Sequence, residues 1–183
     1  MHFSVSEDWL IPAERVPSPN CDQRPVASSL DLIVIHNISL PPKQYGTRNV
    51  LEFFCNQLDC NSHPYFAQLK DVRVSSHLFI RRNGDVVQFV PFNLRAWHAG
   101  QSNFQGRNAC NDFSIGIELE GSDDDPFEAA QYDNLIAVVQ CLLRHYPSLS
   151  AKAIVGHSDI APGRKTDPGP LFDWLRLRSA IST

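Results

Sequence analysis

Short apolar runs bounded by polar residues recur along the chain and predict buried strands. Leu32-Ile33-Val34-Ile35 is rich in β-branched residues and is followed by His36, which is typical of a central strand. Residues 74–80 and 86–90 form two more runs joined by Asn83-Gly84, a dipeptide that favours a hairpin turn. Apolar and polar positions alternate over residues 113–119, and residues 153–156 form a last short run. The pattern therefore predicts several strands of one sheet.

Helical spacing of apolar residues appears between these runs. It predicts helices over residues 49–58, over a long segment that starts at Asp125-Pro126 and ends near Tyr146, and over residues 172–181. Strands alternating with helices indicate an α+β fold with α/β character, in which a central mixed sheet is flanked by helices. We expect a single domain over residues 1–183, in which residues 1–30 form an extended N-terminal lead-in.

Composition narrows the class of protein. The chain has 183 residues, 43% of them hydrophobic and 20% charged, which is usual for a globular domain. The net charge of -4 argues against a nucleic-acid partner, and no apolar run is long enough to predict a membrane span. The acidic N-terminus does not resemble a secretory signal, and five scattered cysteines predict free thiols. We therefore expect a cytoplasmic protein with no membrane or nucleic-acid partner, acting as a monomer.

Residues 156–170 combine an imidazole, an ammonium group and carboxylates with three prolines and three glycines, which predicts a shaped loop and no regular helix. His36 and His157 each follow a short strand, and Asp167 lies ten residues beyond His157. Two histidines and one carboxylate leave a fourth position open, as in a catalytic zinc site, although cobalt or manganese would suit the same ligands. From spacing alone, structural roles for these residues stay open.

Four motifs occur in an order that matches one known family. They are Val34-Ile35-His36-Asn37-Ile38-Ser39-Leu40-Pro41-Pro42, Arg95-Ala96-Trp97-His98-Ala99-Gly100, residues 110–121 and the His157–Pro170 segment. Together they resemble the AmpD family of cytosolic zinc amidases, the 1,6-anhydro-N-acetylmuramyl-L-alanine amidases of peptidoglycan recycling. The broader group includes phage-lysozyme-type amidases and peptidoglycan recognition proteins. The resemblance covers about residues 8–178 and implies the same fold.

The resemblance also implies roles for individual residues. Zinc would be held by His36, His157 and Asp167, with Glu118 as general base and Lys165 stabilising developing negative charge. Zinc can lower the pKa of a bound water to about 7. A carboxylate can move protons during amide hydrolysis, and a positive group can stabilise the oxyanion. The substrate would be a soluble anhydromuramyl peptide, and an effect on β-lactamase induction would arise through depletion of inducer muropeptide.

Other residues allow two interpretations. Glu120 lies on the same predicted strand face as Glu118, and we interpret it as a rim or salt-bridge carboxylate. For His63, His77 and Asp159 we favour structural roles over metal binding. Candidate substrate contacts are Asn37, Arg73, Trp97, His98, Ala99 and Arg107; packing is the alternative for Trp97 and His98, and a solvated side chain is the alternative for the two arginines.

Three rival functions remain at this point. The first is a non-catalytic peptidoglycan-binding module, which the retained candidate ligands argue against. The second is an exported wall-lytic amidase with the same chemistry. The third is a zinc peptidase of another class, for which the chain lacks the H-E-x-x-H helix motif.

Overall fold

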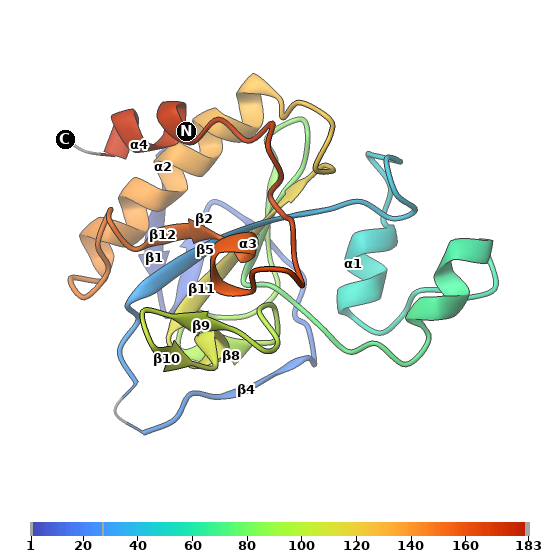
Figure 1. Ribbon diagram of the computed structural model, residues 1–183, viewed down its shortest axis with the longest axis horizontal. Coiled ribbons are helices and arrows are strands. Elements are labelled where there is room, and N and C mark those ends of the chain that lie inside the picture. The colour runs from blue at the N-terminus through green and yellow to red at the C-terminus, as the bar shows by residue number, and fades with distance from the viewer. Residues whose placement is uncertain (1, 27, 182–183) are drawn as a thin grey trace.

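A six-stranded mixed sheet forms the centre of the computed structural model, which describes residues 2–26 and 28–181 (Figure 1). In spatial order its strands are β12 (Ile154–Gly156), β5 (Leu32–Ile38), β11 (Ser114–Glu120), β6 (Leu78–Ile80), β7 (Val86–Gln88) and β3 (Glu14–Arg15). The first four strands are parallel, β7 runs antiparallel to β6, and β3 pairs parallel with β7. The predicted mixed sheet in a single domain is therefore confirmed.

Helices α2 (Ala129–His145) and α4 (Trp174–Ile181) cover one face of this sheet (Figure 1). The side chains of Ile33, Ile115 and Ile117 project toward these helices and pack in one core with Leu135 and Leu142 of α2. Burying this apolar face stabilises the fold by roughly 25 cal/mol for each Å² removed from water. Helix packing thus fixes the sheet from one side and leaves the other face for the site.

The opposite face is covered by shorter elements and two smaller apolar clusters. The helical elements here are α1 (Asn49–Phe54), α3 (His157–Ile160) and the 3-10 turns η1 (Pro64–Leu69) and η2 (Cys110–Asp112). Two two-stranded sheets pair β4 (Cys21–Gln23) with β8 (Leu94–Ala96) and β9 (Asn103–Phe104) with β10 (Arg107–Asn108), whereas a third, of β1 (Ser4–Ser6) and β2 (Trp9–Ile11), packs on the α2 side. In Figure 1, α1 stands apart from the α2–α4 layer, across the sheet.

The expected N-terminal lead-in is part of the fold. Residues 2–23 supply β1 to β4, and β3 forms one edge of the main sheet. The Arg24 guanidinium is buried and donates hydrogen bonds to the carbonyl oxygens of Phe92, Asn111, Asp112 and Ser114. The composition of this segment, rich in proline and polar residues, does not predict these strand pairings and hydrogen bonds, because their partners lie far along the sequence.

Several predicted boundaries were wrong. Helix α2 starts at Ala129 and not at Asp125, because Glu128 is extended and forms a capping box with Gln131. Helix α1 ends at Phe54, and Asn56 follows with a left-handed φ of 58°. Strand β6 starts at Leu78 and α4 starts at Trp174, each later than predicted.

Two further predictions near the site need correction. Strand β5 continues to Ile38, so His36 lies within the strand and not beyond its end. The segment expected to contain no helix has one turn, α3, because residues 157–160 lie between Gly156 and Pro162 and contain no glycine or proline. All five cysteines are free, as predicted. Among the described residues, no helix is long and apolar enough to cross a membrane.

Candidate active site

Strand register brings the candidate residues to one level of the sheet. In the parallel pairing of β11 with β5, Glu118 lies opposite His36. In the pairing of β12 with β5, Gly156 lies opposite Ile35, so His157 follows at the level of His36. Side chains from three adjacent strands therefore meet near their carboxyl ends, where open α/β sheets commonly bind ligands.

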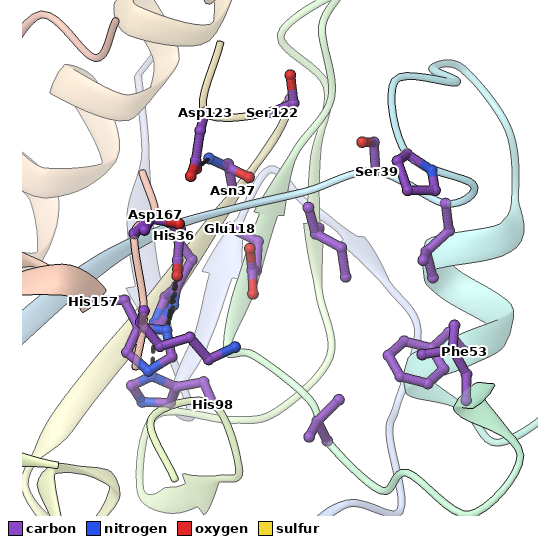
Figure 2. A pocket seen from close by; sticks show the side chains of 18 of the residues that line it. His36, Asn37, Ser39, Phe53, His98, Glu118, Ser122, Asp123, His157 and Asp167 are labelled. Carbon is purple, nitrogen blue, oxygen red and sulfur yellow. Dashed lines mark hydrogen bonds and ion pairs between the residues drawn. The ribbon is translucent and has the colours of Figure 1, made fainter. Parts of the chain in front are cut away.

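His36, His157 and Asp167 form a compact cluster with three facing ligand atoms (Figure 2). The Nδ1 atoms of the two histidines are 3.0 Å apart. Asp167 Oδ2 lies 3.0 Å from His36 Nδ1 and 3.1 Å from His157 Nδ1. The backbone N–H of Ser158 donates to the carbonyl oxygen of Asp167, which folds the loop back onto α3. The structure thus brings together the three residues expected to bind metal.

The donor set fits a divalent transition metal. His157 Nε2 lies 3.0 Å from the carbonyl oxygen of Ala99, which can only accept, so the ring proton is on Nε2 and Nδ1 presents a lone pair. Imidazole nitrogens with a carboxylate oxygen are typical zinc ligands. A cation between the three atoms would bind the lone pairs that otherwise face one another.

The protonation states also suit metal binding. Burial lowers the pKa of His36 to about 4, so its imidazole is neutral near pH 7. Burial alone would raise the pKa of Asp167, but the neighbouring imidazoles of His157 and His36 hold it below its usual range. A neutral imidazole and an ionised carboxylate are the forms that bind metal.

Glu118 is buried beside this cluster without the partners that a buried carboxylate normally has. Among the described residues, its Oε2 has no hydrogen-bond partner. Burial, and then the charge of Asp167, raise the pKa of Glu118 well above its usual value, while Lys165 opposes the shift. An unpartnered carboxylate with a raised pKa is suited to accept a proton from a substrate or a water.

Glu120 has a different environment. Its Oε1 accepts from the backbone N–H of Gly46 at 2.5 Å, and its Oε2 accepts from the backbone N–H of Arg82 at 3.0 Å. It joins two loops and does not line the cavity described below. We expected a rim or salt-bridge carboxylate, and the structure shows a buried one that is bound by backbone groups.

A cavity of about 710 Å³ opens beside the cluster and holds Glu118 and Lys165 in its lining. In Figure 2, Glu118 lies between the histidines and a wall that carries Phe53. The apolar side of this cavity is formed by Leu40, Phe53, Tyr65, Leu69 and Val72. The cavity therefore joins a polar reacting end to an apolar wall, as expected of a site for a ligand with both polar and apolar parts.

The candidate substrate contacts divide into two groups. Asn37 and His98 line the cavity, and the Ala99 carbonyl holds His157. The other three point elsewhere. Arg73 donates to two neighbouring carbonyls, and Arg107 pairs with Asp31 over the Phe113 ring.

Trp97 also lies away from the cavity: its backbone N–H donates to Ser75 Oγ, and its side chain is near Asp22, whose pKa it helps to lower. Arg73, Trp97 and Arg107 are absent from the lining of this cavity. Asp159 accepts from the Gly156 N–H, His63 caps η1, and His77 is buried against Gly116, in agreement with the structural roles we favoured.

Sequence reasoning missed Arg164 and the apolar wall. Arg164 Nη2 donates to the carbonyl oxygens of Ala99 and Gln101, and lies 3.4 Å from His157 Nε2. Its place beside Lys165 was a signal, but charge alone does not show that a side chain folds back on a carbonyl. The wall comes largely from α1 and η1; the sequence predicted a helix over residues 49–58 without a role in the site, and it predicted no element over residues 64–69.

Comparison with known proteins agrees with this geometry. The family model for N-acetylmuramoyl-L-alanine amidase matches residues 25–170. The 1,6-anhydro-N-acetylmuramyl-L-alanine amidase AmpD of Escherichia coli K12 is 52% identical over 178 residues, which cover 97% of each chain. A crystal structure of a selenomethionine derivative of AmpD superposes with a TM-score of 0.94 and 52% identity, covering 97% of this chain and 98% of that one.

A more distant structure is the amidase AmiD from E. coli in complex with the substrate anhydro-N-acetylmuramic acid-L-Ala-D-γ-Glu-L-Lys. It has a TM-score of 0.60 and 31% identity, covering 97% of this chain and 65% of that one. The family match spans most of the chain, and the relative from E. coli aligns along nearly the full length of both proteins. The chain therefore belongs to the N-acetylmuramoyl-L-alanine amidase family of amide hydrolases.

Proposed function

We propose that this protein is a zinc-dependent amidase that hydrolyses the amide between the lactyl group of 1,6-anhydro-N-acetylmuramic acid and the L-alanine of a stem peptide. The observation that carries the proposal is the cluster of His36, His157 and Asp167 beside Glu118, in a cavity of about 710 Å³. Relatives that carry the anhydromuramyl amidase name are about half identical along nearly the whole chain.

In this proposal His36, His157 and Asp167 hold the zinc. When bound, zinc supplies Lewis acidity and promotes ionisation of water near neutral pH. Asp167 adds a negative charge to two neutral imidazoles, which leaves the site with a net positive charge once a divalent ion is present. That charge favours a carbonyl oxygen that becomes negative during attack.

Glu118 acts as the general base. Its side chain lines the cavity, and its carboxylate, with Oε2 unpartnered among the described residues, takes a proton from the attacking water. The same carboxylic acid then passes the proton to the leaving nitrogen, which has to be protonated before the amide can break. The raised pKa of Glu118 strengthens it as a proton acceptor, which favours the first of these two transfers.

Lys165 stabilises the tetrahedral oxyanion. It lines the cavity on the loop that carries Asp167, and its charge is close enough to lower the pKa of Glu118. Removal of one oxyanion-stabilising group typically lowers kcat by about 100- to 1000-fold. Lys165 is not a proposed ligand, so its loss leaves the metal in place.

The substrate proposal is a soluble anhydromuramyl peptide in the cytoplasm, bound by a single copy of the chain. All candidate catalytic and ligand residues come from one chain, which supports a site that is complete in a monomer. Free cysteines, including three that are partly exposed, are in keeping with a reducing compartment. The substrate named for AmiD has the same sugar and first amino acid.

The test is product analysis by mass spectrometry after incubation of the protein with an anhydromuramyl tripeptide. We expect anhydro-N-acetylmuramic acid and the free tripeptide, loss of both products after chelation, and recovery with zinc. An intact substrate in the presence of stoichiometric zinc contradicts the proposal and favours a binding module. Cleavage that persists without metal contradicts the zinc requirement.

A further inference from the structure

The orientation of His36 depends on a series of hydrogen bonds. These bonds link its side chain through His98 and Ser114 to the backbone carbonyl oxygen of Cys110. We propose that His98, held by Ser114 and seated over Gly116, is a positioning residue that keeps the proton of His36 on Nε2 and its Nδ1 lone pair directed at the metal. This inference rests on the proposed function for the identity of the metal site, and it concerns residues that are not metal ligands in that proposal.

The chain of hydrogen bonds starts at the carbonyl oxygen of Cys110. Ser114 Oγ lies 2.5 Å from this oxygen, and a carbonyl can only accept, so the single hydroxyl proton of Ser114 points to it. Ser114 Oγ also lies 3.1 Å from His98 Nε2. Because the hydroxyl proton is already used, His98 Nε2 has to donate to the hydroxyl oxygen.

This donation determines the direction of the remaining hydrogen bond, between His98 and His36. A neutral imidazole carries one proton, so when the proton of His98 is on Nε2 its Nδ1 is an acceptor. His98 Nδ1 lies 2.9 Å from His36 Nε2, which therefore donates. The remaining nitrogen, His36 Nδ1, then presents a lone pair toward Asp167 Oδ2 and His157 Nδ1, each 3.0 Å away.

Gly116 makes room for the His98 ring. A Cβ atom at Gly116 would lie 2.5 Å from Cγ and 2.6 Å from Nδ1 of His98, far inside van der Waals contact. Gly116 is in the middle of β11 and its φ is not positive, so the backbone conformation does not call for glycine here. Glycine is required at position 116 because the His98 ring occupies the space that a side chain would fill.

The two histidine ligands thus differ in what holds them. His157 donates to the carbonyl oxygen of Ala99, an acceptor that no side-chain substitution removes. His36 donates to His98, whose Nδ1 stays an acceptor as long as its Nε2–H donates to Ser114 Oγ. If His36 carried its proton on Nδ1, that proton would occupy the metal position and the ring could not bind zinc.

The first experiment measures the tautomer of His36 by ¹⁵N NMR of its imidazole in the chelator-treated protein, so it does not depend on catalysis. We expect the Nε2–H form in the wild type and a mixture of tautomers in Ser114→Ala and in His98→Phe. The matched control is Ser102→Ala, which removes another buried hydroxyl next to Cys110 that does not contact His98. This control should keep the wild-type tautomer.

The second experiment measures the Kd for zinc by competition with a chromophoric chelator. Loss of a partner that orients a ligand typically weakens metal binding by about 10- to 100-fold. We expect such a change in Ser114→Ala and His98→Phe, and an unchanged Kd in Ser102→Ala. Circular dichroism verifies the fold of each variant, and Ser114→Ala is the informative one if His98→Phe unfolds.

An unchanged His36 tautomer together with an unchanged zinc Kd in Ser114→Ala overturns the inference, as does an equal change in Ser102→Ala. A wild-type protein that binds zinc with His36 as Nε2–H but leaves muropeptides intact contradicts the proposed function and supports the inference. The two failures are therefore distinguishable.

Discussion

Strand β11 carries two buried glutamates near its carboxyl end, Glu118 and Glu120, and their hydrogen-bond partners differ. Glu118 faces the cavity with one oxygen unpartnered among the described residues, whereas both oxygens of Glu120 accept backbone N–H groups. They are two residues apart on the same face of the strand. A carboxylate whose lone pairs are filled by rigid donors stabilises structure, and a carboxylate left unfilled is available for proton transfer.

The largest expected effect comes from the metal, because neither glutamate can support hydrolysis alone in this account. Replacement Asp167→Asn should weaken zinc binding and abolish turnover, since it removes the negative ligand from the cluster. Zinc content by elemental analysis and product formation by mass spectrometry are the measurements. Normal turnover in a protein shown to lack metal would contradict the account.

The second-largest expected effect on activity concerns Lys165, whose positive charge lies near Glu118 in the cavity. Lys165→Met should keep its zinc yet lower kcat by about 100- to 1000-fold, because one group that stabilises the oxyanion is lost. Lys43→Met is the matched control, since Lys43 lines the same cavity but pairs with Asp124 at 2.6 Å. Equal kcat values for the two variants would remove Lys165 from the mechanism.

Glu120 should matter for stability. Glu120→Ala removes the acceptor of the part-buried N–H groups of Gly46 and Arg82, and a hydrogen bond to a charged group contributes about 1.5–3 kcal/mol. The free energy of unfolding should fall by that order in urea titrations, while metal content stays at one zinc per chain. A variant as stable as the wild type would show that these backbone contacts contribute little.

Glu118 should have a smaller effect on stability, of opposite sign. Its pKa in the folded protein lies above the value in the unfolded chain, so folding becomes less favourable as pH rises from the ordinary glutamate pKa through the raised one. Glu118→Gln removes this penalty and should stabilise the chelator-treated protein near pH 7. In urea titrations, the gain should vanish below about pH 4, where both states of the wild type bind the proton.

The sequence predicted the parts of the site that follow short apolar runs. His36 and His157 come after apolar runs, and parallel strands place such residues at one edge, so their meeting could be expected. The role of Asp167 could not be reached from spacing, because it depends on how the loop folds back. Alternation correctly placed Glu118 and Glu120 on one face, but the loops that satisfy Glu120 are remote in sequence.

Boundaries and surface arginines were harder to predict for the same physical reason. The start of α2 is set by the capping box of Glu128 and Gln131, which competes with the equally plausible Asp125-Pro126 signal. Arg107 could have entered the cavity, but Asp31 and the Phe113 ring hold it elsewhere. A long side chain can bind several alternative partners, and only the folded structure shows which of them lie within its reach.

The most direct test of the central claim is kcat for Glu118→Gln and Glu120→Gln, each loaded with one zinc per chain and assayed on an anhydromuramyl tripeptide. General-base catalysis typically contributes about 100- to 10,000-fold, so we expect a loss of that size for Glu118→Gln. Glu120→Gln keeps an acceptor for one of the two N–H groups and should retain much of the wild-type kcat. An inactive Glu120→Gln beside an active Glu118→Gln would contradict the assignment of the base.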